Sequence, residues 1–273
     1  MRFIMYENNN AIILGLDEAG RGPVLGPMVI ALVKATEKDL KKFEELGFRD
    51  SKKLNKSKRN GLYDIIMENY EVKTIILDAS EIDSMIEKTN LNNIEIGVFS
   101  KLINKVLKEE YNIKKGSVED IHYNKKIKIY IDACSNDERV FKNKIKSKLI
   151  LHNKNIEIIA EHGADDKYKI VSAASIIAKV VRDRIIDNYK NIYGEIGSGY
   201  PSDRITINYL KKYIKEHGEL PDIARKCWKT SKNIVKTNNK RKEESANNNK
   251  HHNKKNENNS NKDEREYIQK KLF

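Results

Sequence analysis

Three short apolar runs in this sequence each lead into an aspartate. They are residues 12–16 before Asp17, residues 127–131 before Asp132, and residues 156–160, which Asp165 follows after a short turn. The runs are rich in isoleucine and too short for typical helices, so we predict a strand at each. Residues 127–131 alternate strictly between isoleucine and other side chains, as a regular strand does. A fold built on these strands places three carboxylates at or beyond strand ends.

The segments between the runs have the spacing of amphipathic helices. Strands and helices that alternate along a chain indicate an α/β sheet covered by helices. Thr36 and Ser57 are suited to cap two of the helices, and Gly218 is a typical helix stop. We expect helices over residues 37–46, 57–69, 90–111, 140–150, 170–189, 205–217 and 223–235, and further strands over 28–33 and 70–77.

Charge narrows the class of partner. The 273 residues include 53 Lys and Arg against 40 Asp and Glu, a net charge of +13. A basic protein of this size most often meets a polyanion, and nucleic acid is the leading candidate. No apolar run approaches the roughly 18 residues of a membrane span, so we expect no membrane association. The N-terminus does not resemble a secretory signal, and the widely spaced Cys134 and Cys227 form no disulfide framework or zinc cluster, which predicts a cytoplasmic protein.

Composition divides the chain into two regions. Residues 1–235 are expected to form the folded catalytic body, with a net charge of +8, and residues 236–273 an Asn- and Lys-rich tail with a net charge of +5. The tail holds too few apolar side chains to offset the entropy of ordering it, so we predict disorder. Its simplest interpretation is a solvated appendage.

The three aspartates suggest a metal site. Sites in open α/β sheets form beyond the carboxyl ends of strands. Carboxylates gathered there repel one another and lose hydration, and a divalent cation relieves both costs. Oxygen ligands favour Mg²⁺ or Mn²⁺ over zinc, and phosphoryl chemistry uses pairs of such ions. The alternative for each aspartate taken alone is a helix cap.

Glu18 adjoins Asp17 but points to the opposite face of a regular strand. The two share a site only if the chain bends between them. The following Gly20-Arg21-Gly22-Pro23 makes a bend plausible and lets backbone N–H groups approach a ligand closely. Taken alone, Gly-Arg-Gly is more typical of an ordinary turn.

Five segments, in order, resemble the motifs of type 2 ribonuclease H, the ribonuclease HII family. The most specific are residues 16–27, with Asp-Glu-Ala-Gly-Arg-Gly-Pro, and residues 164–179, with Ala-Asp-Asp-Lys-Tyr. The resemblance covers about residues 11–235, and its last part is closer to the archaeal and eukaryotic branch than to the bacterial one. The other segments are Asp50-Ser51-Lys52-Lys53-Leu54, Tyr130-Ile131-Asp132 and Gly197-Ser198-Gly199-Tyr200-Pro201-Ser202-Asp203.

This resemblance implies the ribonuclease H fold, a mixed five-stranded sheet flanked by helices with a C-terminal helical region. It implies an endonuclease that hydrolyses the RNA strand of RNA–DNA hybrids and incises DNA 5′ to embedded ribonucleotides, in replication and ribonucleotide excision repair. The expected products are a 5′-phosphate and a 3′-hydroxyl, and the expected cofactors are two Mg²⁺ or Mn²⁺ ions. The implied catalytic and metal-binding acids are Asp17, Glu18, Asp132 and Asp165, since the register of Ala-Asp-x-x-Tyr selects Asp165 over Asp166.

Substrate and partner contacts also follow from the resemblance. Gly20, Arg21 and Gly22 are expected to read the ribose 2′-hydroxyl, Tyr200 to meet the sugar at an RNA-to-DNA junction, and Lys52 and Lys53 to hold phosphates. The alternatives are an ordinary surface tyrosine and solvated lysines, and His162 is either a local imidazole or an aid to proton transfer or product release. Gln269–Phe273 faintly resembles a sliding-clamp-binding peptide, although its aromatic spacing is degenerate. We expect a monomer.

Three rival classes remain at this point. A non-catalytic nucleic-acid binder would need the basic charge but no acids at strand ends. Another nuclease or transposase of the same broad fold would share the acids but lack Gly-Arg-Gly and the junction tyrosine. The related ribonuclease HIII normally carries an extra N-terminal domain, for which the ten residues before the apolar stretch that begins at Ala11 leave little room.

Overall fold

The computed structural model describes residues 11–48, 54–113, 125–135, 137–152 and 154–244. Its centre is a five-stranded mixed sheet in the order β3-β2-β1-β4-β5. β1 pairs in parallel with β4 and antiparallel with β2, while β4 and β5 are parallel. The elements are β1 Ile12–Ala19, β2 Met28–Thr36, α1 Glu37–Glu45, α2 Lys56–Asn69, β3 Glu71–Leu77, α3 Ala79–Ile86, α4 Leu91–Glu110, β4 Ile127–Asp132, α5 Glu138–Ser147, β5 Ile156–Glu161, α6 Ala164–Lys167, α7 Lys169–Tyr193 and α8 Arg204–His217.

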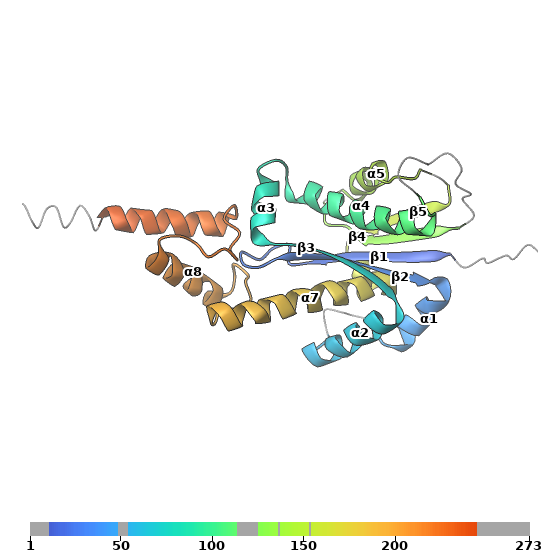
Figure 1. Ribbon diagram of the computed structural model, residues 1–273, viewed down its shortest axis with the longest axis horizontal. Coiled ribbons are helices and arrows are strands. Elements are labelled where there is room, and N and C mark those ends of the chain that lie inside the picture. The colour runs from blue at the N-terminus through green and yellow to red at the C-terminus, as the bar shows by residue number, and fades with distance from the viewer. Residues whose placement is uncertain (1–10, 49–53, 114–124, 136, 153, 245–273) are drawn as a thin grey trace, which may run out of the picture.

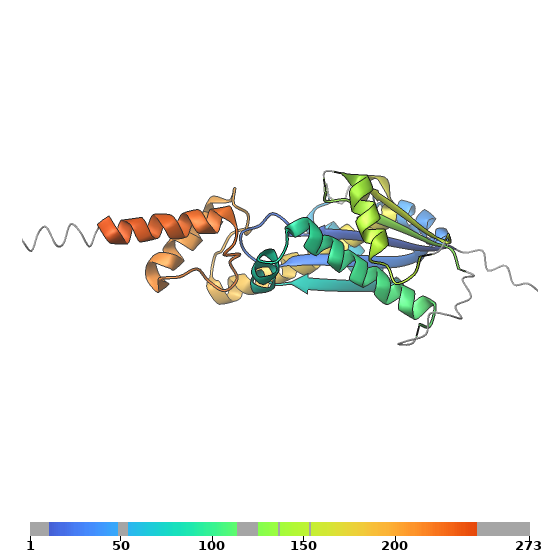
Figure 2. The same ribbon diagram turned by 90° about the horizontal axis from the view of Figure 1, so that it is seen from above.

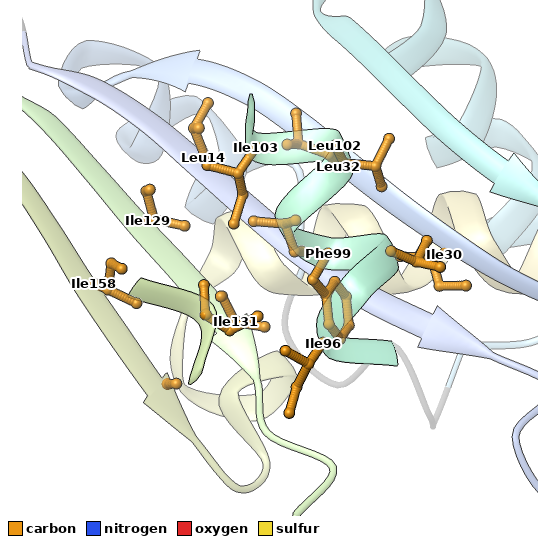
Figure 3. Packing of buried hydrophobic residues seen from close by; sticks show 14 of the residues in the cluster. Leu14, Ile30, Leu32, Ile96, Phe99, Leu102, Ile103, Ile129, Ile131 and Ile158 are labelled. Atoms are coloured by element: carbon orange, nitrogen blue, oxygen red, sulfur yellow. The ribbon is translucent and has the colours of Figure 1, made fainter. Parts of the chain in front are cut away.

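Helices cover both faces of the sheet. Figure 1 shows α4 and α5 on one side and α7 with α1 and α2 on the other. The side of α4 holds an apolar cluster in which Phe99, Leu102 and Ile103 pack on the even-numbered positions of β1 and β2, such as Leu14 and Ile30 (Figure 3). The odd-numbered positions of β1 face α7 and belong to a second cluster. The period-two alternation of each strand therefore sorts its side chains between two cores.

α7 lies unusually close to the central strand. A Cβ atom at Gly15 of β1 would collide with the backbone carbonyl of Ile170 in the first turn of α7. Only glycine allows this approach, because any other side chain would push the helix away from the sheet. The contact brings the first turns of α7 beside the end of β1.

A third apolar cluster joins the C-terminal helices to the loop after β1. It includes Leu25, Ile186 of α7, Leu210 of α8 and Ile234. Ala224 forms an isolated bridge with Leu25. Figures 1 and 2 show α8 and the helical residues 229–244 extending from one end of the sheet. The late part of the chain is thereby held against the loop that follows β1.

The expected α/β fold, a mixed sheet flanked by helices with a C-terminal helical region, is confirmed. The structure differs in detail at several places. α3 was not predicted, and α2 is capped by the side chain of Asn55 rather than by Ser57. The last helix begins at residue 229 rather than 223, because the residues before it pair with the loop after β1. It also continues to residue 244, into the stretch expected to be a tail.

Among the described residues, no helix is both long enough and apolar enough to cross a membrane.

Candidate active site

Asp17 and Asp132 come together because β1 and β4 are parallel neighbours. Leu16 lies opposite Ile131 in the register of the two strands, so the next residue of each strand is an aspartate. Both aspartates follow the side-chain alternation onto the α7 face. Asp17 is only 4% exposed, and Ser175 and Lys179 of α7 are its polar neighbours. The sheet topology thus puts two carboxylates side by side beneath one helix.

Asp165 reaches the same point from the turn after β5. Gly163 adopts a left-handed conformation, with φ of 65°, and starts the short helix α6. The N–H of Ala164 donates a hydrogen bond of 3.0 Å to the carboxylate of Asp132. This turn buries Asp165 and leaves the neighbouring Asp166 exposed. One carboxylate oxygen from each of Asp17, Asp132 and Asp165 lies within 4.8 Å of the others.

The electrostatics of this cluster are unfavourable without a cation. Burial, followed by the nearby carboxylate of Asp132, raises the pKa of Asp17 to about 7, although Ser175 and Lys179 partly oppose the shift. Such crowding of buried acids is the environment that a bound divalent ion stabilises. The donor set consists of carboxylate oxygens, which suits Mg²⁺ or Mn²⁺. The residues present therefore fit the metal predicted from the sequence.

Glu18 lies beside this group and not within it. β1 continues to Ala19, so the chain does not bend between Asp17 and Glu18 and the two side chains leave opposite faces. Burial, followed by the negative charges of Asp17 and Glu95, raises the pKa of Glu18 well above its usual range. One oxygen of the Glu18 carboxyl group is buried with no hydrogen-bond partner in the described part of the chain. The role of Glu18 as a metal ligand stays a prediction.

A cleft of about 480 Å³ opens next to Glu18. Its lining includes Gly20, Arg21 and Gly22 on one side and Lys179, Arg182 and Tyr200 on the other. The cleft therefore brings the Gly-Arg-Gly segment and Tyr200, which are far apart in the sequence, to one place. Basic side chains outnumber acidic ones in its lining, four (Arg21, Arg59, Lys179 and Arg182) to two (Glu18 and Asp183), which suits an anionic ligand.

In the Gly20-Arg21-Gly22 loop, the carbonyl groups and the N–H groups point to opposite sides. The buried guanidinium of Arg225 donates hydrogen bonds to the carbonyl oxygens of Gly20, Arg21 and Gly26, and the indole of Trp228 donates to the carbonyl of Gly22. In a trans peptide the C=O of one residue and the N–H of the next point in opposite directions. The N–H groups of Arg21 and Gly22 consequently point away from Arg225, and neither donates a hydrogen bond to another described residue. Within the described part of the chain they are therefore free donors, and both residues line the cleft.

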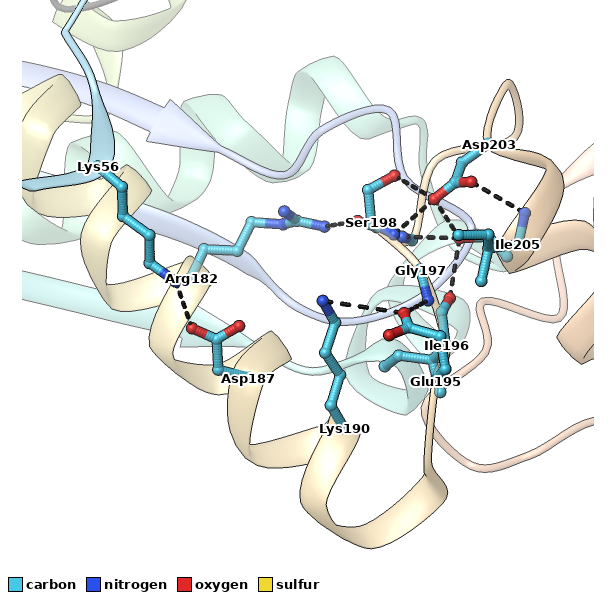
Figure 4. Close-up of polar contacts among 12 residues, drawn as sticks. Lys56, Arg182, Asp187, Lys190, Glu195, Ile196, Gly197, Ser198, Asp203 and Ile205 are labelled. Atoms are coloured by element: carbon cyan, nitrogen blue, oxygen red, sulfur yellow. Dashed lines mark hydrogen bonds and ion pairs between the residues drawn. The ribbon is translucent and has the colours of Figure 1, made fainter.

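Tyr200 is held at the cleft by a hydrogen-bonded loop. Asp203 accepts hydrogen bonds from the N–H and hydroxyl of Ser198 and from the N–H of Ile205, which closes the loop onto the start of α8 (Figure 4). Arg182 donates to the carbonyl of Ser198 and lies 5.4 Å from the centre of the Tyr200 ring. Tyr200 is 41% exposed, so its ring is available to a ligand.

Some predicted site residues lie outside the described part of the chain. These are Lys52, Lys53 and the peptide Gln269–Phe273, so the roles expected for them stay predictions. His162 is exposed, and its backbone N–H donates to the carboxylate of Glu138.

Sequence reasoning missed two buried charges near the loop. Glu95 of α4 is fully buried beside Arg21, and burial raises its pKa while the Cys134 thiol and Arg21 lower it. Arg225 is also fully buried. The signal for Glu95 was present, because it interrupts the apolar face of a predicted helix, one turn after Leu91 and one before Phe99. Arg225 had no comparable signal, since its partners are about 200 positions earlier in the chain.

Comparisons with known proteins agree with this geometry. A family model described as Ribonuclease HII matches residues 14–231. A ribonuclease HII of Methanococcus aeolicus is 59% identical over 230 residues, which cover 84% of this chain and 83% of that protein. The crystal structure of ribonuclease H2 from Pyrococcus horikoshii OT3 is similar with a TM-score of 0.71 and 36% identity, over 84% of this chain and 99% of that one. The ribonuclease HII in a complex with PCNA from Archaeoglobus fulgidus gives a TM-score of 0.67 and 30% identity, over 80% and 95% of the two chains.

The sheet and its buried acids are those of a ribonuclease H, a class of hydrolases that act as metal-dependent endonucleases on RNA–DNA hybrids. Within that class, two findings identify the family: the Ribonuclease HII family model matches residues 14–231, and the identity to an archaeal ribonuclease HII reaches 59%. The chain belongs to the ribonuclease HII family. The resemblance noted in the sequence is thereby confirmed.

Proposed function

We propose that this protein hydrolyses the RNA strand of RNA–DNA hybrids and incises duplex DNA on the 5′ side of an embedded ribonucleotide, leaving a 5′-phosphate and a 3′-hydroxyl. The observation that carries the proposal is the juxtaposition of two features. One oxygen from each of three carboxylates lies within 4.8 Å of the others, and beside them opens a cleft lined by backbone N–H groups that bond to no other described residue. The first suits phosphodiester hydrolysis and the second suits recognition of a sugar hydroxyl.

Asp17, Asp132 and Asp165 are the residues that would hold Mg²⁺ or Mn²⁺ on the α7 face of the sheet. Glu18 leaves the opposite face of β1 and would take part by reaching a second ion at the end of that strand. Ions so held supply a water of lowered pKa and neutralise charge on the leaving oxygen. The protein's own contribution is positional. α6 and the N-terminal turns of α7 fix the acids before substrate arrives, which avoids the cost of arranging them during the reaction.

The cleft would select the sugar. The N–H groups of Arg21 and Gly22, two residues that line the cleft, would donate to a 2′-hydroxyl, which deoxyribose lacks. The Tyr200 ring offers an apolar surface against which the sugar of the next nucleotide can pack. Lys52 and Lys53 would add contacts to phosphates that weaken as salt concentration rises.

The sliding clamp is the proposed protein partner. The similar archaeal ribonuclease HII of Archaeoglobus fulgidus was solved in a complex with PCNA. The candidate clamp-binding peptide of this chain is Gln269–Phe273, the last five residues of the sequence. A pull-down with the clamp of the same organism tests it, and unchanged clamp binding after deletion of residues 267–273 would rule the peptide out.

Cleavage-site mapping tests the proposed activity. The three substrates are an RNA–DNA hybrid, a DNA duplex with one ribonucleotide and the same duplex in DNA alone, each with and without Mg²⁺ or Mn²⁺. We expect metal-dependent cuts in the first two, on the 5′ side of the ribonucleotide in the second, and none in the third. Asp17→Asn should abolish cleavage and leave binding of the hybrid largely intact. Cleavage of plain DNA, or full activity of Asp17→Asn, would refute the proposal.

A further inference from the structure

Glu95 is a charged residue in the apolar interior of the protein. It lies in the second turn of α4, is fully buried, and is flanked along the helix by the buried residues Ile94, Ile96 and Phe99. Burying a carboxylate is unfavourable unless partners compensate for its lost hydration. An apolar residue of similar size would pack here without that cost. Stability alone therefore does not account for Glu95.

The residues around the Glu95 carboxylate come from the loops that follow β1 and β4, the strands that carry Asp17 and Asp132. Its carboxylate forms an ion pair with the guanidinium of Arg21, in the loop after β1. Arg21 also donates a hydrogen bond of 2.6 Å to the side-chain oxygen of Asn92, one helical turn earlier. The side chain of Cys134, two residues after Asp132 at the end of β4, lies near the same carboxyl group. The second oxygen of this carboxyl group, Oε1, is buried and has no hydrogen-bond partner among the described residues.

These contacts fix the direction of the Arg21 side chain. Two of its guanidinium nitrogens are engaged by α4, so the side chain, which is 34% exposed, is held against that helix, while its backbone N–H bonds to no other described residue. Arg225 holds the carbonyl groups of the same loop. The side chain of Arg21 is thus the second anchor of a loop whose donors must be fixed to recognise one hydroxyl group.

We propose that Glu95 is a positioning residue for sugar recognition. Through its ion pair with Arg21 it fixes the orientation of the Gly20–Gly22 backbone. This inference rests on the proposed recognition of the 2′-hydroxyl. It predicts that Glu95 controls discrimination between ribose and deoxyribose without itself touching the substrate.

The test is binding of two matched DNA duplexes in EDTA, where no cleavage occurs. One duplex carries a single ribonucleotide and the other is DNA throughout, and fluorescence anisotropy gives the ratio of their dissociation constants. Glu95→Gln keeps the size of the side chain and removes its charge. We expect its discrimination ratio to fall about tenfold, the equivalent of one charge-assisted hydrogen bond, with affinity for the all-DNA duplex unchanged.

A double-mutant cycle separates this role from a general loss of structure. If Glu95 acts through Arg21, then adding Glu95→Gln to Arg21→Ala changes the discrimination ratio no further. Multiplicative effects of the two substitutions would overturn the proposal, because Glu95 would then act by another route, such as its charge near Glu18. Ser100→Ala is the matched control, since Ser100 is buried on the same helix and bonds only to the carbonyl of Ile96 among the described residues.

The outcomes also separate this inference from the proposed function. A wild-type protein that binds both duplexes equally contradicts 2′-hydroxyl recognition itself. A wild-type protein that discriminates, with Glu95→Gln discriminating equally well, contradicts only the role of Glu95. If Glu95→Gln does not fold, Asn92→Ala removes the other anchor of Arg21 at a less buried position. We then expect a smaller fall in the same ratio, and no fall would overturn the proposal.

Discussion

The guanidinium of Arg225 donates a hydrogen bond of 2.5 Å to the carbonyl oxygen of Gly20, which lies 205 positions earlier in the chain. Gly20 has φ of 88°, and a Cβ atom there would lie 2.6 Å from the side chain of Arg182. The loop after β1 is thus packed against two arginines from different helical regions of the C-terminal half. Asp83 of α3 accepts from the N–H groups of Lys226 and Cys227 and fixes the segment that carries Arg225.

Replacing Arg225 should therefore impair recognition of ribose more than it impairs binding of nucleic acid. Arg225→Lys keeps the charge but cannot reach three carbonyl groups in a fixed plane. Each misplaced hydrogen bond is worth about 0.5–1.5 kcal/mol, so we expect kcat/KM on a single-ribonucleotide duplex to fall roughly 2- to 12-fold for each donor affected. Steady-state cleavage of that duplex, with melting curves to verify folding, measures the effect.

Lys226→Ala is the matched control for this experiment. The Lys226 side chain is exposed, and only its backbone N–H makes the contact with Asp83. We expect its discrimination between the ribonucleotide and all-DNA duplexes to equal that of the wild type. Equal discrimination by Arg225→Lys would show that the loop keeps its orientation without the three hydrogen bonds.

The adjacent residues Asp165 and Asp166 test whether activity depends on the cluster of Asp17, Asp132 and Asp165, because only Asp165 belongs to it. Asp165 is 3% exposed and shares the space with Asp17 and Asp132, whereas Asp166 is exposed. We expect Asp165→Asn to reduce kcat by at least about 100-fold, the scale on which loss of a preorganised charge affects an active site. Asp166→Asn should retain nearly full activity. Comparable losses in both variants would place the metal elsewhere.

The raised pKa of Asp17 predicts how stability of the metal-free protein depends on pH. Its folded-state pKa of about 7 lies above the ordinary value of 3.8, so the native state binds a proton that the unfolded state releases. The associated stability is present below about pH 4 and is lost as pH rises towards and through 7. In EDTA, the melting temperature should therefore fall between pH 5 and pH 8, and less steeply in Asp17→Asn.

Added Mg²⁺ should reverse that trend. A cation bound to the native state stabilises it by mass action, and it binds best when the carboxylates are ionised. We expect a larger rise in melting temperature with Mg²⁺ at pH 8 than at pH 5.5, and a reduced rise in Asp17→Asn. A rise of equal size at both pH values would mean that the ion binds away from this cluster.

The sequence was sufficient to predict the placement of Asp17 and Asp132 but not that of Asp165, which the turn at Gly163 and α6 bring to the site. The first two positions depend on regular strands. Alternation and parallel pairing put their side chains on one face without any knowledge of the loops. The expectation that failed locally was the bend between Asp17 and Glu18, since β1 continues through Ala19. The residue at which a strand ends depends on how far the neighbouring strands of the sheet continue to pair with it. Local sequence does not show this.

Tertiary partners explain most of what sequence reasoning missed. Glu95 interrupts the apolar face of a predicted helix, but no local pattern shows that its partner is Arg21, 74 positions earlier in the chain. Arg225 belongs to a segment with helical composition that pairs instead with the loop after β1. α3 was predictable, because Asp78 and Glu81 form a capping box at its start, a pattern readable from spacing alone.

The loop that presents Tyr200 gives the last prediction, which concerns both stability and activity. Hydrogen bonds, first from the N–H and hydroxyl of Ser198, lower the pKa of Asp203 to about 2. The stability that Asp203 contributes is therefore present above about pH 4 and is lost as pH falls towards 2. Because Asp203 also caps α8, Asp203→Ala should lower the free energy of unfolding by about 1–2 kcal/mol at pH 7.

The same substitution should release Tyr200 from its place opposite Gly22. We expect kcat/KM on a single-ribonucleotide duplex to fall in Asp203→Ala to the level of Tyr200→Ala, because both remove the positioned ring. The double variant should be no worse than either single one. Asp222→Ala, at an exposed aspartate of the same C-terminal part, serves as the control. A wild-type rate in Asp203→Ala would show that Tyr200 is placed by Arg182 and its own neighbours, without the contacts that Asp203 makes to Ser198.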